Sequence, residues 1–207
     1  MYASVNLVKS TNTKMESKKL KYKKLDGISE KQLSEHHDVL YVGYVNKVAA
    51  IDKALNSVNL EGVNATFSDL RELKIEETFA VNGVKLHEAY FDNLGGNGLP
   101  SGKITELIKR DFGSIDSWKK EFMACGLAAR GWVVLAFDLD TKKLRNVVCD
   151  LHNQGGVWNC VSLLVLDVYE HAYFIDFATA RAKYIDVFMK NIDWADVNSR
   201  LKKFKVE

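Results

Sequence analysis

The sequence has one proline, three cysteines and no long apolar run, and these scarcities argue against several classes of protein. Cys125, Cys149 and Cys160 form an odd set without a CxxC pair, so neither a disulfide framework nor a zinc knuckle is indicated. We therefore expect free thiols and a cytoplasmic protein. No apolar stretch approaches the roughly 18 residues of a membrane-spanning helix, so the chain is not expected to cross a membrane.

The N-terminus also lacks the charged start and apolar stretch of a secretory leader, so export is not expected. The net charge is only +2, with 29 basic and 27 acidic residues, which is too balanced to predict a nucleic-acid-binding protein. Apolar residues make up 47% and charged residues 27%, the ordinary mixture of globular proteins. The 207 residues suit one large domain or two small ones.

Residues 1–24 form a polar stretch that is rich in lysine. The lysines are Lys14, Lys18, Lys19, Lys21, Lys23 and Lys24. A charge run of this size indicates a flexible, solvated arm. A contact with nucleic acid or another anionic surface would be the alternative, and we assign the arm no function.

Two helical runs follow, separated by a polar break at residues 59–68. In the first run, apolar and aromatic residues recur at steps of three and four: Leu33, His37, Leu40, Tyr44, Val48, Ile51 and Leu55. Ser29 or Ser34 could cap its start. The second run places Val84, His87, Phe91 and Leu94 on one side. Two helices joined by a short loop predict an antiparallel hairpin.

The segment 95–102 holds four glycines and the only proline, the strongest boundary signal in the chain. We therefore predict a helical hairpin domain over 25–96 and a C-terminal domain over 103–207. In the latter, the pattern predicts helices at 104–110, 115–127, 170–191 and 194–203, and strands at 132–139, 144–151 and 160–166. The fold class is therefore α+β: a helical hairpin, then a small three-stranded antiparallel sheet with flanking helices.

The chain has five histidines, and one of them lies in an informative cluster. Asp167 and His171 are four residues apart where an apolar strand gives way to a helix, so their side chains can converge. His36 and His87 each lie on a helix of the predicted hairpin, which could present both imidazoles inward. Three nitrogens and one oxygen suit iron, manganese or zinc. The residues alone thus indicate a mononuclear redox or hydrolytic metal site, or an Asp cap beside buried structural histidines.

The segment 167–174, Asp-Val-Tyr-Glu-His-Ala-Tyr-Phe, resembles the DVWEHAYY signature of the iron/manganese superoxide dismutase family. The resemblance extends in the family's order over about residues 22–205. Its other motifs are Glu35-His-His-Asp38, Tyr41-Val-Gly-Tyr-Val-Asn46, Leu86-His87, Tyr90-Phe91, Ser114-Ile-Asp-Ser-Trp118 and Gly131-Trp132.

The resemblance implies metal ligands, an activity and a cofactor. The ligands would be His36, His87, Asp167 and His171, holding one iron or manganese ion. The activity would be disproportionation of superoxide to oxygen and hydrogen peroxide. The resemblance does not choose between the two metals.

The resemblance also implies roles for residues around the ion. Tyr44 would stand at the mouth of the substrate channel, and Trp132 and Tyr169 would form part of an aromatic shell. The residue beside the metal-bound solvent would be His152, because Gly83 occupies the alternative helix position. Glu170 would reach a metal-binding histidine of a second subunit, which implies a homodimer or a dimer of dimers.

Two departures from the family pattern form a pair. Leu40 stands where the family usually has a second channel histidine, and Phe174 replaces the tyrosine that binds it across the interface. Losing both polar partners together leaves no buried group unsatisfied, but it can alter proton delivery. A catalytically inactive metal-binding member of the fold therefore stays open as an alternative. A metal hydrolase is a weaker one, because the sequence has no HExxH motif.

Overall fold

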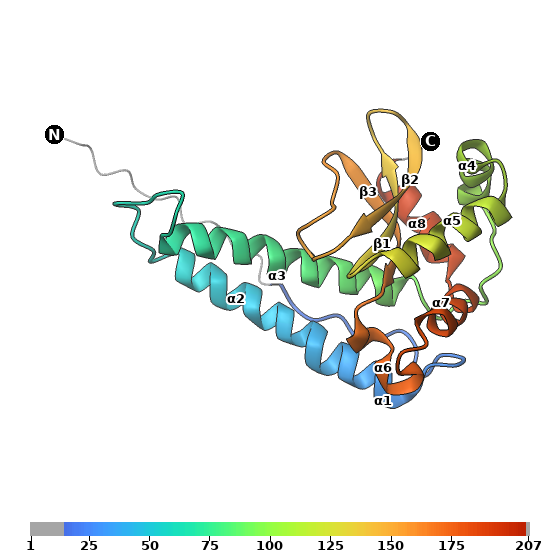
Figure 1. Cartoon of the computed structure of the whole chain (residues 1–207), viewed down its shortest axis with the longest axis horizontal. Coiled ribbons are helices and arrows are strands. Elements are labelled where there is room, and N and C mark those ends of the chain that lie inside the picture. The colour runs from blue at the N-terminus through green and yellow to red at the C-terminus, as the bar shows by residue number, and fades with distance from the viewer. Residues whose placement is uncertain (1–14, 206–207) are drawn as a thin grey trace.

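The computed structural model describes residues 15–205, in which a long helical hairpin projects from a body of helices and one sheet (Figure 1). The first arm is helical from residue 30 to residue 55. It comprises α1 (Glu30–Ser34), the wider π-helical turns of η1 (Glu35–Tyr41) and α2 (Val42–Leu55). The second arm is α3 (Asp69–Asp92), which runs back along the first. The predicted hairpin is therefore present.

The hairpin forms because each helix has a start signal and one apolar side. The Ser29 hydroxyl accepts a hydrogen bond from the backbone N–H of Gln32, which caps α1. Val45, Val48 and Ile51 of α2 are buried at helical spacing. The facing side of α3 buries Val84, and it also buries His87. The same packing therefore carries one candidate ligand into the interior.

The body contains a three-stranded antiparallel sheet that packs against the hairpin. The helices before the sheet are α4 (Lys103–Phe112) and α5 (Ile115–Ala128), and the strands are β1 (Trp132–Asp138), β2 (Lys143–Cys149) and β3 (Cys160–Asp167). The strand order is β2-β1-β3, and every residue of the central β1 is buried. In the pairing of β1 with β3, Trp132 lies opposite Asp167. The sheet and its flanking helices confirm the predicted α+β class.

The last third of the chain differs from the prediction of a single helix over 170–191. The structure has three short pieces instead: η2 (Glu170–Ala172), α6 (Phe174–Phe177) and α7 (Arg181–Lys190). The first break comes at Tyr173, whose φ of -147° and ψ of -13° are not helical. The second comes at Ala178, whose φ of +47° lies in the left-handed region that a right-handed helix cannot include. The predicted final helix is present as α8 (Trp194–Lys203).

The predicted lysine-rich arm lies partly outside the described residues, which begin at Met15. Its described part makes some contacts with the rest of the protein, while the side chains of Lys18 and Lys21 stay 55% and 42% exposed. The Lys18 ammonium pairs with Glu88 of α3 at 2.8 Å, and that of Lys21 pairs with Asp193 at 2.6 Å. Leu20 and Tyr22 pack against the hydrophobic core. Carboxylates distant in the sequence thus hold these lysines against the ends of α3 and α8.

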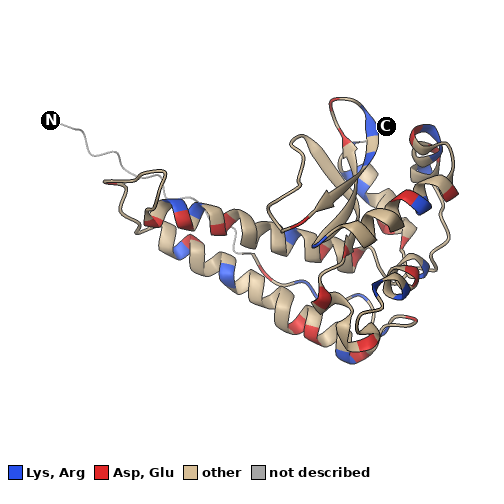
Figure 2. Cartoon of the chain, viewed as in Figure 1, with Lys and Arg blue, Asp and Glu red and all other residues tan. Residues whose placement is uncertain are grey.

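The distribution of charge and the absence of a membrane-spanning helix among the described residues bear on the predictions made from composition. Figure 2 shows Lys and Arg interspersed with Asp and Glu along the hairpin and the body, as the balanced composition suggests. No helix within residues 15–205 is both long and apolar enough to span a bilayer. The division into two domains at residues 97–102 stays a prediction.

Candidate metal centre

Four side chains from distant parts of the chain meet where the hairpin contacts the body. His36 comes from η1, His87 from α3, Asp167 from the end of β3 and His171 from η2. One ligand atom from each lies within 4.8 Å of the others. Three of the residues are buried, and the side chain of His171 is one-quarter exposed, at 25%. The structure therefore brings all four predicted residues to one point.

Asp167 lies at the centre of the cluster. Its Oδ2 is 3.1 Å from Nε2 of His36, 3.2 Å from Nε2 of His171 and 3.6 Å from Nε2 of His87. Its other oxygen, Oδ1, accepts a hydrogen bond from the backbone N–H of Tyr169 at 2.9 Å. That backbone bond fixes the carboxylate plane and leaves Oδ2 facing the three imidazoles.

His87 is oriented by its own helix. Its Nδ1 lies 2.7 Å from the carbonyl oxygen of Gly83, one turn earlier, and a carbonyl can only accept, so Nδ1 carries the proton. Nε2 is therefore an unprotonated acceptor. It is buried without a hydrogen-bond partner among the described residues. An unpaired buried nitrogen is costly, and an ion bound at this point would satisfy it.

The protonation states suit a metal. Burial opposes ionisation of Asp167, but the charges and hydrogen bonds of His171 and His36 outweigh it and hold the pKa of this carboxyl far below its usual range. Burial lowers the pKa of His36, and burial together with His36 lowers the pKa of His87 to about 3. Burial also acts on His171, but attraction to Asp167 outweighs it and raises its pKa. Metal binding requires an ionised carboxylate and neutral imidazoles. Asp167, His36 and His87 are shifted towards these forms, whereas His171 is shifted towards its protonated form and would release that proton when an ion binds.

This donor set fits one ion of intermediate hardness. Three imidazole nitrogens and one carboxylate oxygen suit iron, manganese or zinc. Calcium and magnesium prefer sites made mostly of oxygen ligands, which this set does not provide. The unpartnered Nε2 of His87 points to the same conclusion. The residues present therefore fit a mononuclear transition-metal site.

Tyr44, His152 and Trp132 form a hydrogen-bonded chain beside the cluster. Nε1 of Trp132 lies 2.9 Å from Nδ1 of His152, and because indole can only donate, Nδ1 of His152 is the acceptor. Nε2 of His152 must then carry the proton, and it donates to the Tyr44 hydroxyl at 2.7 Å. The proton of the Tyr44 hydroxyl remains available to a further acceptor. His152 is 5% exposed, so it is not a surface residue of its loop.

Tyr169 and Glu170 lie where the chain passes from β3 into η2: Tyr169 immediately precedes η2, and Glu170 is its first residue. The Tyr169 ring stacks on His171 with a centroid separation of 5.2 Å, and it meets Trp132 edge to face at 6.1 Å. Glu170 is exposed, and its carboxylate has no hydrogen bond or ion pair within residues 15–205. The structure thus places Tyr169 in the aromatic wall of the site and leaves Glu170 free to contact another molecule.

Leu40 and Phe174 line the same cavity as His171. This cavity has a volume of about 350 Å³ and is otherwise lined by Lys31, Glu35, Val39, Glu170 and Ile175. Leu40 is half-buried and Phe174 is 47% exposed. Both positions at which the chain departs from the family pattern therefore border a cavity that reaches one candidate ligand, His171.

Sequence reasoning missed the residues that hold the ligands in place. Nε2 of the buried Gln32 donates to the carbonyl oxygen of His171 at 2.6 Å, and its Oε1 accepts from the backbone N–H of Ile175 at 3.1 Å. The Tyr184 hydroxyl donates to the carbonyl oxygen of Asp167 at 2.8 Å. The one sequence signal for Gln32 was its place as a polar residue in the first turn of a predicted helix, next to the apolar Leu33.

Gly83 has a second role that the sequence did not reveal. A Cβ atom at this position would lie 2.9 Å from Cδ1 of Tyr44, inside van der Waals contact. The Tyr44 ring can therefore lie against α3 only because residue 83 has no side chain. This close approach sets the position from which Tyr44 reaches His152.

Comparisons with known proteins agree with the site. A family model for the C-terminal domain of iron/manganese superoxide dismutases matches residues 100–200. Iron superoxide dismutases of Aquifex aeolicus and Aquifex pyrophilus are each 41% identical over 189 residues, covering 89% of both chains. A manganese superoxide dismutase of Haloarcula marismortui is 38% identical over 169 residues, 81% of this chain and 82% of its own. The resemblance seen in the sequence is confirmed, and the chain belongs to the iron/manganese superoxide dismutase family.

Proposed function

We propose that this protein is a superoxide dismutase that binds one iron or manganese ion through His36, His87, Asp167 and His171. The observation that carries the proposal is the convergence of three imidazole nitrogens and one carboxylate oxygen within 4.8 Å. Similarity to superoxide dismutases of both metal types over most of the chain supports the activity. Nothing in the described structure favours a catalytically inactive member of the fold.

The overall reaction consumes two superoxide ions and two protons and yields one oxygen and one hydrogen peroxide. Bound iron or manganese would supply the one-electron redox couple that links the two halves of this reaction. Three of the proposed ligands are not acids at neutral pH, because the Asp167 carboxylate ionises readily and the His36 and His87 imidazoles are neutral. The protein must therefore supply the two protons from other groups.

Tyr44 and His152 are the groups we assign to proton delivery. The Trp132 indole fixes the tautomer of His152, and His152 in turn donates to the Tyr44 oxygen. This series of hydrogen bonds directs the hydroxyl proton of Tyr44 away from His152 and towards an incoming anion. The Tyr44 hydroxyl is a weak acid, since burial raises its pKa, so it passes a proton on only to a strong base such as reduced superoxide.

We further propose a homodimer, or a dimer of dimers, formed through Glu170. The support is an exposed carboxylate with no partner in its own chain, located next to His171. Exposed apolar side chains surround it, including Val39, Phe174 and Ile175. With Leu40 and Phe174 apolar, this interface would lack one polar pair and bury hydrocarbon there instead.

Three finer proposals accompany the function. We place the protein in the cytoplasm with an antioxidant role, supported by three cysteines that are all free thiols. We keep the division into a helical hairpin domain, 25–96, and a C-terminal domain, 103–207. We leave the ion as iron or manganese, because the similar proteins include both types.

The test is to load purified protein with iron, manganese or zinc and to measure superoxide consumption per bound metal atom. We expect turnover with iron or manganese and none with zinc, which lacks a redox couple. His171→Ala should lose metal and turnover together. Stoichiometric iron and manganese without turnover would instead identify a metal-binding protein that is not an enzyme, and a fully metallated, active His171→Ala would refute the proposed ligands.

A further inference from the structure

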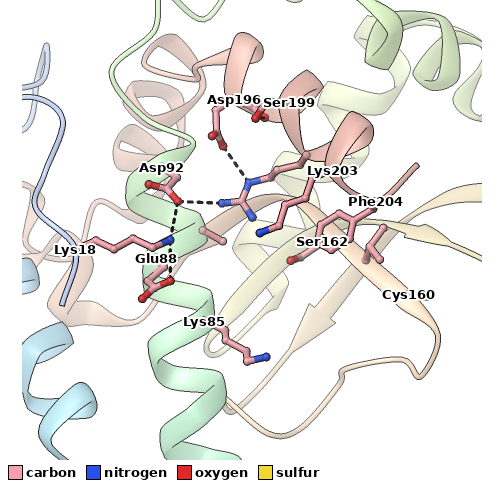
Figure 3. Close-up of a pocket in the computed structure, with 13 residues that line it drawn as sticks. Lys18, Lys85, Glu88, Asp92, Cys160, Ser162, Asp196, Ser199, Lys203 and Phe204 are labelled. Atoms are coloured by element: carbon pink, nitrogen blue, oxygen red, sulfur yellow. Dashed lines mark hydrogen bonds and ion pairs between the residues drawn. The ribbon is translucent and has the colours of Figure 1, made fainter. Parts of the chain in front are cut away.

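A cavity of about 490 Å³ lies between α3, β3 and α8, and the metal centre does not use it (Figure 3). Its wall includes Lys85 of α3, Ser162 of β3 and Lys203 of α8. In Figure 3 the side chains of Lys203 and Ser162 extend towards α3, and that of Lys85 extends from α3 towards the sheet. Donors from three elements thus face one space.

The carboxylates of this cavity are already paired. Glu88 binds the Lys18 ammonium at 2.8 Å and accepts from the Tyr41 hydroxyl at 3.0 Å. Asp92 contacts Lys18 and Arg200, each at 3.4 Å. The third carboxylate, Asp196, accepts hydrogen bonds from Arg200 at 3.0 Å and from Asn93 at 2.8 Å. The acids are therefore satisfied within the protein.

The remaining donors have no such partners. Among the described residues, neither the Lys85 ammonium nor the Lys203 ammonium makes a hydrogen bond or an ion pair, and the Ser162 hydroxyl makes no hydrogen bond. The cavity is lined by four cationic side chains and three carboxylates, so it carries one uncompensated positive charge. Free donors, satisfied acids and a single excess positive charge favour a monovalent anion.

An apolar groove adjoins the cavity. It has a volume of about 270 Å³ and shares three lining residues with the cavity, namely Lys85, Cys160 and Ser162. Beyond them the groove is lined mainly by apolar side chains of the sheet, of α3 and of the following loop, and its polar residues are Asn82 and His152. The apolar residues are Val134, Ala136, Val147, Leu86 and Val157. The cationic cavity is therefore adjoined by a mainly apolar groove.

We propose that the cavity and the groove together bind an amphipathic organic anion, a carboxylate with a linear hydrocarbon chain. Its head group lies against Lys85, Lys203 and Ser162, and its chain lies in the groove beside Val147. The single excess charge matches a carboxylate better than a phosphate monoester, which carries about two charges at neutral pH. The binding combines charge-assisted hydrogen bonds at the head with apolar burial along the chain.

The test is calorimetric titration of the metal-loaded protein with three probes, of which the two amphiphiles are kept below their micelle concentrations. Decanoate carries both features, acetate carries only the head group, and decyltrimethylammonium carries a similar chain with the opposite charge. We expect saturable binding of decanoate at one site per chain and no measurable binding of the other two. Comparable binding of decyltrimethylammonium, or no binding of decanoate, would overturn the proposal.

Paired variants locate the site. Lys203→Glu should weaken decanoate binding about tenfold, because it removes a charge-assisted contact. Lys202→Glu makes the same change one residue earlier on α8, outside the cavity lining, and should alter binding less than twofold. Equal effects of the two variants would show that only net charge matters, and would overturn the head-group assignment.

A second pair tests the groove. Val147→Ser should weaken decanoate binding about fivefold, since less apolar surface is buried. Val148→Ser changes the neighbouring residue, which does not line the groove, and should leave binding unchanged. Metal content should stay the same in all four variants, because none alters a proposed ligand. A loss of binding in Val148→Ser that equals the loss in Val147→Ser would overturn the groove assignment.

Discussion

His152 donates a hydrogen bond from Nε2 to the Tyr44 hydroxyl across 2.7 Å, and it does so because Trp132 occupies its other ring nitrogen. Tyr44 belongs to the hairpin and His152 to the loop after β2. This one bond therefore ties the two halves of the fold together beside the candidate metal centre. It also suggests which substitutions separate proton delivery from metal binding.

His152→Ala should reduce turnover without emptying the metal site. The four proposed ligands are untouched, but Tyr44 loses the donor that directs its hydroxyl, so we expect kcat to fall about 10- to 100-fold. The measurement is superoxide consumption per metal atom. Asn153→Ala is the control, since its amide binds Thr78 away from Tyr44. Normal kcat in His152→Ala would contradict our assignment.

Gly83→Ala should displace the Tyr44 ring. The added Cβ would lie 2.9 Å from that ring, so the bond to His152 should be lost and kcat should fall. Gly43→Ala provides a matched control on α2, where a Cβ would meet nothing within 4 Å. The control should keep full activity and gain about 0.5–1 kcal/mol of unfolding free energy. Equal activity of the two variants would show that the close approach is unimportant.

His36→Ala should abolish metal binding, whereas His37→Ala should not. The two residues are adjacent on η1, but His36 faces Asp167, and His37 lies 2.9 Å from the carbonyl oxygen of Lys18 through its Nε2. Elemental analysis of folded protein provides the comparison. We expect less than a tenth of the wild-type metal content in His36→Ala. Similar metal loss in both variants would mean that the site responds only to general destabilisation.

The Lys21–Asp193 pair should make stability depend on pH. Burial opposes ionisation of Asp193, but its hydrogen bond and attraction to Lys21 outweigh burial and hold its pKa below the usual value. A carboxyl with a lower pKa in the folded state stabilises the protein fully above its unfolded pKa of about 3.9, and this contribution is lost as pH falls through the folded pKa.

Asp193→Asn isolates that contribution. Asparagine retains the cap that Asp193 provides to α8, where its Oδ1 accepts from the backbone N–H of Ala195 at 3.0 Å. We expect the wild type to be more stable than the variant at neutral pH, and the difference to shrink as the pH falls from about 5 to 2. Urea unfolding across this range measures it. A constant difference would exclude the ion pair as its source.

Glu170→Ala should weaken self-association. If Glu170 reaches a histidine of a second copy, removing it should raise the dimer dissociation constant about tenfold. Analytical ultracentrifugation gives that constant. Glu106→Ala on α4 is the control, since Glu106 forms an exposed pair with Lys103. A monomeric wild type would refute the proposed dimer.

The elements that could be predicted from the sequence are those whose signal is local. The spacing of Val48, Ile51 and Leu55 predicts the first helix, and the β-branched and aromatic residues of 132–139 predict the central strand. The break at Ala178 has no glycine or proline to mark it. It depends on tertiary contacts, including the Arg181 guanidinium, which donates to the carbonyl oxygen of Ala129 at 2.8 Å.

The site divides in the same way. Asp167 and His171 could be paired from their spacing, and His36 and His87 could be added from their places on the predicted hairpin, while the family resemblance supplied their assignment as ligands of one ion. Gln32 could not be found, because its role lies in contacts with backbone groups 139 and 143 positions later. The ion pairs of Lys18 and Lys21 could not be found for the same reason: their carboxylate partners are distant in the sequence.

The wide sequence separation within the candidate metal centre constrains when it can form. His36 and Asp167 are 131 positions apart, and His171 follows near the C-terminal end. A nascent chain on the ribosome lacks two of the four donors until Asp167 has emerged, and the set is complete only when His171 follows. The four donors can therefore surround one ion only after residue 171 has been synthesised and the hairpin has packed against the sheet.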